Sequence, residues 1–344
     1  MVNSLSRNKI QTEIDPTGSK CLVTGANGFV GSHLCEKLLS VGCRVCALVR
    51  KTSDLRFLKD LHIEYRYGDV CHPQSLDNAV RDIDFIFHSA GLTKAKDYED
   101  FYKVNHIGTL SLLEAALNNG EPPKRFIYIS SLAACGPGEN HTPVTEEHTP
   151  NPVTTYGKSK LRGEEEVVKR FDSISSTIIR PPSIYGPRDK EIYTFFKTAS
   201  MGIKPYFGRE EAILSMVYID DLIHGIIKAA FSSKTTSEIY FTTDGEVYTW
   251  DDVVSCLLGV FDKKGIHINI PISLFLWLGS FSEQITKAMG KAPMFTREKA
   301  YEITRRNWAC SCRKAMEVFG YSPKVKFSEG AKLTAKWYKE KKWL

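Results

Sequence analysis

A glycine-rich turn between an apolar strand and an amphipathic helix constrains the fold of this chain more than any other stretch. Residues 21–34 read Cys-Leu-Val-Thr-Gly-Ala-Asn-Gly-Phe-Val-Gly-Ser-His-Leu, with glycines at positions 25, 28 and 31. Glycine lets the chain turn sharply and lets backbone N–H groups approach a ligand without a Cβ in the way. The positive end of the following helix favours an anion such as pyrophosphate. A purely structural strand-to-helix turn is the alternative.

Segments typical of strands and helices alternate along the first half of the chain. Apolar strands are predicted at residues 21–24, 44–49, 63–67, 84–88, 124–129 and 176–180. The helices predicted between them include a short one over 53–61, with Ser53 as its N-cap, and long ones over 97–118 and 156–171. This alternation predicts a Rossmann-type α/β fold, a doubly wound parallel sheet with helices on both faces. In such a fold, ligands lie at the carboxyl ends of the strands.

The 344 residues are enough for one large domain and a smaller one. We expect residues 1–19 to form a flexible extension, because they are polar and end in Asp-Pro-Thr-Gly. Residues 20–186 are expected to form the Rossmann domain. Beyond them the alternation gives way to short mixed elements, so we expect 187–344 to form a smaller mixed α/β C-terminal lobe. A segment near 215–245 is expected to return to the Rossmann domain.

Composition and charge exclude several classes of protein. The net charge is only +6, and the lysines of the C-terminal tail are interleaved with apolar residues at helical spacing. That pattern predicts a solvated helix face rather than a nucleic-acid site. The nine cysteines are scattered, and the C-x-x-C spacing of Cys43 and Cys46 has no second pair to complete a zinc site. We therefore expect reduced thiols, no metal site and a cytoplasmic protein.

The most apolar stretch runs from Ile266 to Phe281. Two polar residues and a proline interrupt it, and it is shorter than the about 20 residues that span a bilayer, so no transmembrane segment is predicted. Its large apolar side chains recur at helical spacing, at Leu274, Trp277, Leu278 and Phe281. A core or lid helix explains this pattern. The alternatives are the lining of an apolar substrate pocket or a peripheral contact with a membrane surface.

The sequence Tyr156-Gly-Lys-Ser-Lys160 places a phenol and an ammonium one turn apart on the same face of a helix. A phenol with its ordinary pKa of about 10 exchanges protons poorly at neutral pH. A nearby ammonium favours the phenolate and lowers that pKa, which makes the tyrosine useful as a general acid or base. Ser131, at the end of a neighbouring strand, is placed to hold a substrate oxygen beside the phenol. A Tyr–Lys pair on an exposed helix is the alternative interpretation.

Together with the glycine turn, these residues resemble the short-chain dehydrogenase/reductase superfamily, in its extended branch. The resemblance runs from Lys20 to the C-terminus and includes the T-G-x-x-G-x-x-G turn at 24–31. Further ordered matches are Gly-Asp-Val at 68–70, His-Ser-Ala-Gly at 88–91, Asn105, Tyr128–Ser131, Arg-Pro-Pro-Ser-Ile-Tyr-Gly-Pro at 180–187 and Val-Tyr-Ile-Asp-Asp at 217–221. The resemblance extends to its epimerase/dehydratase, hydroxysteroid-dehydrogenase-like and dihydroflavonol-reductase-like members.

This resemblance implies a role for each matching residue. Tyr156 would be the proton donor or acceptor, Lys160 would bind the nicotinamide ribose and tune Tyr156, and Ser131 would orient the substrate oxygen. Asn105 would support the site and Ser183 would contact the substrate, which the C-terminal lobe would bind. The implied cofactor-binding residues are Gly25, Asn27, Gly28, Phe29, Val30, Gly31, Arg50, Asp69, Val70, Ala90, Tyr156, Lys160 and Pro182.

Charge at the end of the second strand indicates which dinucleotide is bound. An acidic residue there would bind the ribose hydroxyls of NAD, but this chain has Arg50, followed closely by Lys51 and Ser53. A guanidinium suits a 2′-phosphate. We therefore expect NADP to be preferred, with NAD as the alternative if Arg50 only stacks on the adenine.

The substrate is constrained by a residue that the chain lacks. Nucleotide-sugar members of the extended branch commonly carry an Arg-Asp pair directly before a Phe-Val-Tyr-Ile-Asp-Asp segment. That segment matches residues 216–221 here, and the two residues before it are Leu214 and Ser215. Arg188 and Arg209 are the remaining candidates for phosphate contacts. The missing arginine favours an oxidoreductase that interconverts a secondary alcohol and a ketone on a fairly apolar small molecule.

Two rival functions stay open. One is a nucleotide-sugar epimerase or dehydratase with tightly bound NAD, which would use the same three catalytic residues. The other is a cofactor-binding regulatory protein that has lost catalysis, against which the intact Ser131, Tyr156 and Lys160 count. The resemblance also implies a homodimer, built from the helix over 97–118 and the helix that carries Tyr156.

Overall fold

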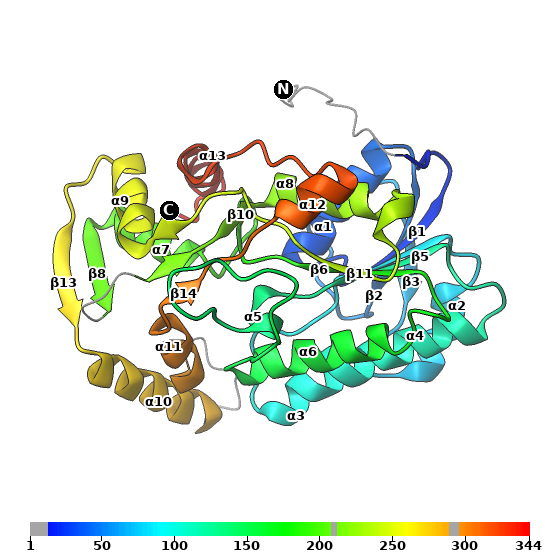
Figure 1. Cartoon of the computed structure of the whole chain (residues 1–344), viewed down its shortest axis with the longest axis horizontal. Coiled ribbons are helices and arrows are strands. Elements are labelled where there is room, and N and C mark those ends of the chain that lie inside the picture. Colours follow the sequence, from blue (N-terminus) through cyan, green and yellow to red (C-terminus); the bar gives the residue numbers. More distant parts are fainter. Residues whose placement is uncertain (1–12, 208–211, 289–295) are drawn as a thin grey trace.

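A seven-stranded parallel sheet forms the centre of the computed structural model, which describes residues 13–207, 212–288 and 296–344 (Figure 1). Its strand order is β3-β2-β1-β4-β5-β6-β11, which contains the doubly wound order expected of a Rossmann-type sheet. The strands are β1 (Lys20–Thr24), β2 (Arg44–Val49), β3 (Glu64–Tyr67), β4 (Phe85–His88), β5 (Arg125–Ile129), β6 (Ser176–Arg180) and β11 (Glu238–Phe241). The predicted fold class is confirmed. Residues 1–12 of the expected extension lie outside the described residues.

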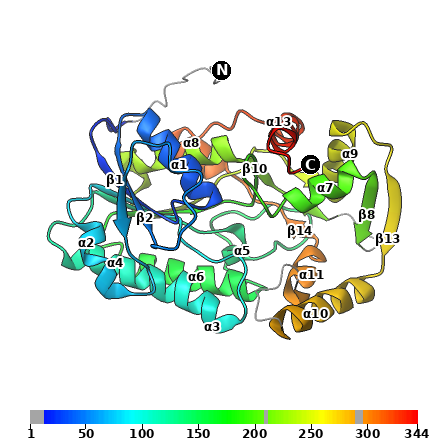
Figure 2. The ribbon, with the colours of Figure 1, turned by 180° about the vertical axis from the view of Figure 1, so that it is seen from behind.

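Helices cover both faces of this sheet because successive strand residues point in opposite directions. Cys21 and Val23 of β1 pack in one apolar core with α1 (Phe29–Ser40) and α8 (Ile219–Ala230). Leu22 packs in the other core with α4 (Gly108–Asn118), α6 (Thr155–Val168) and the short α2 (Asp77–Val80). Figures 1 and 2 show α1 and α8 on one side of the sheet and α4 and α6 on the other.

The helix predicted over 97–118 is present but is not uniform. It begins at α3 (Tyr98–Phe101), where Asp97 caps it by accepting a hydrogen bond from the Asp100 N–H (3.0 Å). A π-helical turn over Tyr102–Ile107 follows and leads into α4. Such wide turns often occur at functional sites, and this one carries Asn105.

The prediction of a short helix over 53–61 is wrong. Residues 51–61 form turns instead, and the Ser53 hydroxyl accepts a hydrogen bond from the Arg50 N–H (3.0 Å). A serine side chain that bonds to an earlier backbone group closes a turn and is not available as the N-cap of a following helix.

Short elements follow the Rossmann strands. β7 (Ser183–Tyr185) pairs with β10 (Met216–Tyr218), β8 (Ile203–Phe207) pairs with β13 (Ile266–Ile270), and β9 (Ile213–Leu214) lies between β12 (Tyr248–Thr249) and β14 (Asn307–Trp308). The helices here are α7 (Tyr193–Ser200), α9 (Trp250–Val260), α10 (Ile272–Ala288), α11 (Arg297–Ile303), α12 (Arg313–Phe319) and α13 (Phe327–Glu340). β8, β13 and α10 lie at the end of the molecule remote from β1, β2 and β3 (Figures 1 and 2).

The lysine-rich tail forms α13, as its helical spacing predicts. Phe327, Ala331 and Tyr338 are buried, while Lys332 and Lys336 are exposed on the opposite face. Throughout the described ranges, no helix is both long and apolar enough to cross a membrane.

Candidate active site

The glycine turn lies between β1 and α1, at the carboxyl edge of the sheet. Gly25 has φ +64°, and a Cβ there would lie 2.8 Å from the Ala90 nitrogen. A Cβ at Gly31 would lie 2.2 Å from the Gly25 oxygen. Gly28 is exposed directly before α1, and no side chain caps the first N–H groups of that helix. This cradle of backbone N–H groups at a helix N-terminus fits the pyrophosphate of a dinucleotide.

A buried chain of hydrogen bonds fixes this turn against β4 and α4. The Thr24 hydroxyl lies 2.7 Å from His88 Nδ1 and accepts a bond from the Ala90 N–H (3.1 Å). His88 Nε2 lies 3.0 Å from the Thr109 hydroxyl. Burial, assisted by the positive charge of Lys160, lowers the pKa of His88 to about 3. His88 is therefore neutral at physiological pH and holds strands in place rather than exchanging protons.

The end of β2 faces Asp69. The exposed Arg50 places Nη1 4.0 Å from Asp69 Oδ2, while Asp69 Oδ1 accepts a hydrogen bond from the Cys71 N–H (2.9 Å). Val70 is buried beside α4, where a Cβ at Gly108 would lie 2.7 Å from it. The guanidinium of Arg50 is thus held loosely at the edge of the sheet.

Ser131, Tyr156 and Lys160 come together beyond the ends of β5 and β6. Ser131 caps the short α5 (Leu132–Cys135), and Thr154 caps α6 by accepting a hydrogen bond from the Gly157 N–H (3.0 Å). The pKa of Tyr156 is raised, not lowered as expected from the nearby ammonium of Lys160. Burial raises it well above its ordinary value, and a hydrogen bond with Ser131 opposes that rise. The phenol is therefore protonated at neutral pH and can donate its proton to a substrate oxygen.

The ammonium of Lys160 lies one helical turn deeper than Tyr156. It donates a hydrogen bond to the Ile129 carbonyl (2.7 Å) and lies 4.1 Å from the centre of the Tyr128 ring. Burial lowers the pKa of Lys160 to about 7, although Glu164 acts in the opposite direction. Its charge is thus sensitive to pH changes near neutrality.

A buried ion pair beneath Lys160 was missed by sequence reasoning. Arg180, at the end of β6, donates to both carboxylate oxygens of Glu164, at 2.9 and 2.5 Å, and both side chains are 2% exposed. The Ser130 hydroxyl also donates to Glu164 (2.5 Å). The signal available in the sequence was a glutamate one turn after Lys160 together with an arginine ending an apolar strand.

Asn105 joins the π-helical turn to the loop after β4 and to α6. Its amide nitrogen donates to the Leu92 carbonyl (3.0 Å) and the Ser159 hydroxyl (2.9 Å), and its oxygen accepts from the Leu92 N–H (2.8 Å). Pro182 is buried just past β6, and Ser183 is exposed at the start of β7.

Helix α11 contributes charged groups that sequence reasoning also missed. The carboxylate of Glu298 accepts hydrogen bonds from the N–H (2.9 Å) and hydroxyl (2.6 Å) of Thr155, the residue before Tyr156. Lys299 donates to Glu302 (2.9 Å), and the carboxylates of Glu302 and Glu191 further raise the pKa of Tyr156. We call the pair of Glu298–Thr155 hydrogen bonds the α11 latch.

A cleft of about 710 Å³ opens between the residues that lead into α6 and the end of α11. Its size is that of a typical small-molecule site. Its lining is Pro137, Gly138, Glu139, Asn140, His141, Asn151, Val153, Thr304, Arg305 and Arg306.

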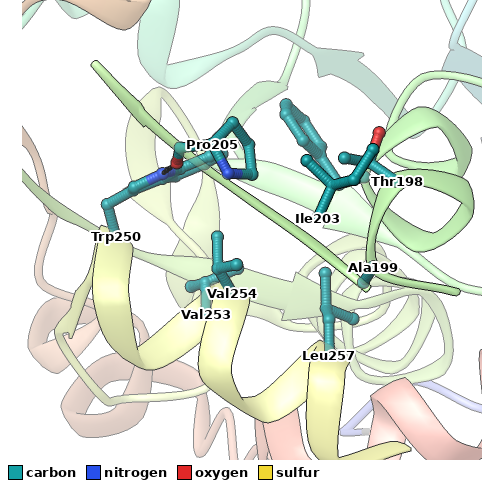
Figure 3. Close-up of a pocket in the computed structure, with 9 residues that line it drawn as sticks. Thr198, Ala199, Ile203, Pro205, Trp250, Val253, Val254 and Leu257 are labelled. Carbon is teal, nitrogen blue, oxygen red and sulfur yellow. Dashed lines mark hydrogen bonds between the residues drawn. The ribbon is translucent and has the colours of Figure 1, made fainter. Parts of the chain in front are cut away.

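A second, apolar pocket lies between α7, β8 and α9 (Figure 3). Trp250 forms one wall, and its indole N–H donates to the Pro205 carbonyl (3.0 Å). The pocket has room for about 10 Å³, which is the volume needed by a single water. It is therefore a packing defect rather than a substrate site.

The described residues contain no group of three or more metal-ligating side chains that could hold an ion. The structure brings the glycine turn, Ala90, Ser131, Tyr156, Lys160 and Pro182 to one edge of the sheet, with Arg50 and Asp69 beside them. This edge fits a dinucleotide for two reasons: the glycine turn lets backbone N–H groups come close to a ligand, and the N-terminus of α1 lies beside that turn.

Comparisons with known proteins agree with this geometry. Residues 21–240 match the model of the NAD dependent epimerase/dehydratase family. The chain is 30% identical to the ceramide reductase of Caulobacter vibrioides, over 94% of this chain and 95% of the relative. It is 26% identical to the decarboxylating sterol-4-alpha-carboxylate 3-dehydrogenase of Mus musculus, over 92% of this chain and 90% of that relative.

A solved structure shows the same architecture. The UDP-glucuronic acid 4-epimerase of Bacillus cereus in complex with NAD superposes with a TM-score of 0.74, at 25% identity, over 93% of this chain and 97% of that one. The family model, the relatives and the strand order all indicate the same family along most of the sequence. The chain belongs to the NAD dependent epimerase/dehydratase family, a family of enzymes.

Proposed function

We propose that the protein is an NAD(P)-dependent oxidoreductase that interconverts a secondary alcohol and a ketone on an apolar, lipid-like substrate. The observation that carries this proposal is the convergence of Ser131, Tyr156 and Lys160 at the sheet edge that holds the glycine turn. Two of the similar proteins are named for ceramide and for a sterol carboxylate, which are both large apolar molecules.

In this reaction the dinucleotide supplies or accepts the hydride. Ser131 donates a hydrogen bond to the substrate oxygen and holds it beside the phenol. Tyr156 donates its proton to that oxygen as a ketone is reduced, and takes the proton back in the reverse direction. Lys160, when charged, favours the phenolate left behind and binds ribose hydroxyls. Glu164 keeps Lys160 charged at higher pH than burial alone would allow.

We infer that NADP is the preferred dinucleotide. Arg50 lies at the carboxyl end of β2, exposed and only loosely associated with Asp69, so its guanidinium is available to a 2′-phosphate. The test is the ratio of NADPH to NADH affinities before and after Arg50→Asp. A preference for NADPH that reverses in the variant is expected; equal affinities in the unaltered protein would contradict the assignment.

The positions considered from the sequence for phosphate contacts give little support to a nucleotide sugar. Ser215 is buried and hydrogen-bonded to the Cys310 backbone, so it serves the fold. Arg188 donates to Ser32 (3.0 Å) and to Glu36 (2.5 Å), and is thereby committed to α1. Arg209 lies outside the described residues. These positions favour an apolar substrate over a nucleotide sugar.

We further propose a cytoplasmic homodimer in which the helix spanning α3 to α4 and helix α6 pack against their copies. Tyr98 is exposed on α3 and stacks near Tyr102, 5.9 Å between ring centres, which offers an aromatic surface to a second subunit. Light scattering at micromolar concentration tests this, with a monomer as the contradicting result.

The activity is tested by offering the purified protein ceramide or a sterol-4-alpha-carboxylate, which are alcohols, with NADP or NAD, and the 3-keto form of ceramide with NADPH or NADH. Nicotinamide absorbance reports net turnover, and Tyr156→Phe is the matched inactive variant. Net turnover that disappears in Tyr156→Phe is expected. Protein that retains bound NAD through purification and turns over nucleotide sugars without net redox change would instead establish an epimerase or dehydratase.

A further inference from the structure

Helix α10 exposes its large apolar side chains. Leu274, Trp277, Leu278 and Phe281 are between 41% and 57% exposed and lie at the spacing of one helix face. The rings of Trp277 and Phe281 are stacked, 5.3 Å between centres with 9° between planes. These four side chains form a continuous apolar stripe, and large exposed apolar patches mark interaction sites.

The opposite face of α10 is the one fixed against the protein. Gly279 is buried, and a Cβ there would lie 2.8 Å from the Thr296 carbonyl oxygen at the start of α11. The hydroxyls of Ser280 and Thr286 are half-buried and donate to carbonyls of their own helix. The inner face thus carries Gly279, two hydroxyls and the half-buried Leu276, while Leu274, Trp277, Leu278 and Phe281 face outward.

The strand before α10 also exposes apolar side chains. Ile266 is 71% exposed and Ile268 is 42% exposed, and the two point to the same side of β13 because side chains alternate along a strand. Two exposed lysines, Lys263 and Lys264, directly precede β13, beside a single acidic residue, Asp262. β13 leads into α10 at the end of the molecule remote from β1 (Figures 1 and 2).

We propose that this apolar face of β13 and α10 docks on the surface of an anionic lipid bilayer. An apolar helix face containing tryptophan, phenylalanine and leucine has the composition of an element lying in the membrane interface. The lysine pair adds attraction to anionic headgroups. The inference rests on the proposed function, since a lipid-like substrate would be taken from such a surface.

The path from this face to the catalytic helix is short. α10 packs against α11, and the α11 latch joins α11 to Thr155, next to Tyr156. Docking would therefore place the bilayer one helix away from the cleft that Thr304, Arg305 and Arg306 line at the end of α11.

Vesicle sedimentation tests the proposal without requiring turnover. The full chain is mixed with phosphatidylcholine vesicles with and without phosphatidylglycerol. The test variant is Trp277→Ser with Phe281→Ser, and the control is Tyr67→Ser with Met316→Ser, two residues elsewhere with similar exposure of 56% and 46%. We expect the test variant to lose affinity for vesicles by at least about tenfold, because it removes two aromatic anchors. The control variant should bind as the unaltered protein does.

The lysines supply an independent prediction: Lys263→Glu with Lys264→Glu should abolish the preference for anionic vesicles. Failure of the unaltered protein to bind vesicles, or equal binding by the Trp277/Phe281 variant, would overturn the proposal. A dimer that this variant dissociates, without vesicle binding, would assign the face to a second copy and also overturn it. Vesicle binding together with the absence of any Tyr156-dependent turnover would count against the proposed function alone.

Discussion

Replacing Glu164 by glutamine tests the buried support of the catalytic helix. Glu164 and Arg180 are joined by two hydrogen bonds, and both side chains are almost fully removed from water. The substitution leaves a buried guanidinium facing a neutral amide, whose NH₂ group cannot accept its hydrogen bonds. Breaking a buried pair by removing one partner costs about 3–5 kcal/mol.

The same helix offers a matched control. Glu165 pairs with Arg162 at 2.8 Å, but these side chains are 37% and 59% exposed, so Glu165→Gln should cost no more than about 1 kcal/mol. Urea unfolding measures both free energies, with the slope of the transition unchanged. A second change, Arg180→Met added to Glu164→Leu, should recover much of the stability, because it removes the stranded charge.

A loss for Glu164→Gln within about 1 kcal/mol of that for Glu165→Gln would refute this reasoning. It would mean that the guanidinium of Arg180 finds water or another acceptor when the carboxylate is neutralised. The same variant should also bind dinucleotide more weakly near pH 7, because Glu164 raises the pKa of Lys160.

Three further predictions follow from the site. His88 is neutral in the folded protein down to about pH 3, whereas in the unfolded chain it binds a proton below about pH 6.5. The free energy of unfolding should therefore fall by about 2 kcal/mol between pH 7 and pH 5 because of this group. Urea unfolding of His88→Gln should show a correspondingly smaller fall over the same pH range. Glu298→Gln weakens the α11 latch and should increase hydrogen exchange of α11, while Glu317→Gln on α12 should leave that exchange unchanged. Gly31→Ala should abolish dinucleotide binding measured by calorimetry, because the new Cβ would overlap the Gly25 carbonyl. Retained affinity would contradict the assignment of the glycine turn as the pyrophosphate site.

Six strands of the Rossmann sheet were predictable from sequence because their signals are local, whereas the seventh, β11, was not predicted as a strand. Each buried strand reads as a short apolar run. Gly25 is required by its positive φ, and Gly31 by contacts within the turn itself. Tyr156 and Lys160 were predictable for the same reason, since one helical turn joins them.

The parts that were not predictable depend on contacts between distant segments. Glu164 meets Arg180 only because α6 crosses the end of β6, and Glu298 meets Thr155 only because α11 folds back over α6. The outward face of α10 is another example. Its periodicity predicts a helix equally well whichever way it faces, and the close approach of Gly279 to Thr296 decides the orientation.

The central claim is that a hydride passes between the dinucleotide and a substrate carbon while Tyr156 moves the proton. It is tested most directly with NADPH carrying deuterium at the transferred position and the ketone that the protein turns over. The account predicts one deuterium on the alcohol carbon of the product. It also predicts a rate about 10²–10⁴-fold lower in Tyr156→Phe. A product without deuterium, or a Tyr156→Phe variant as fast as the unaltered protein, would contradict it.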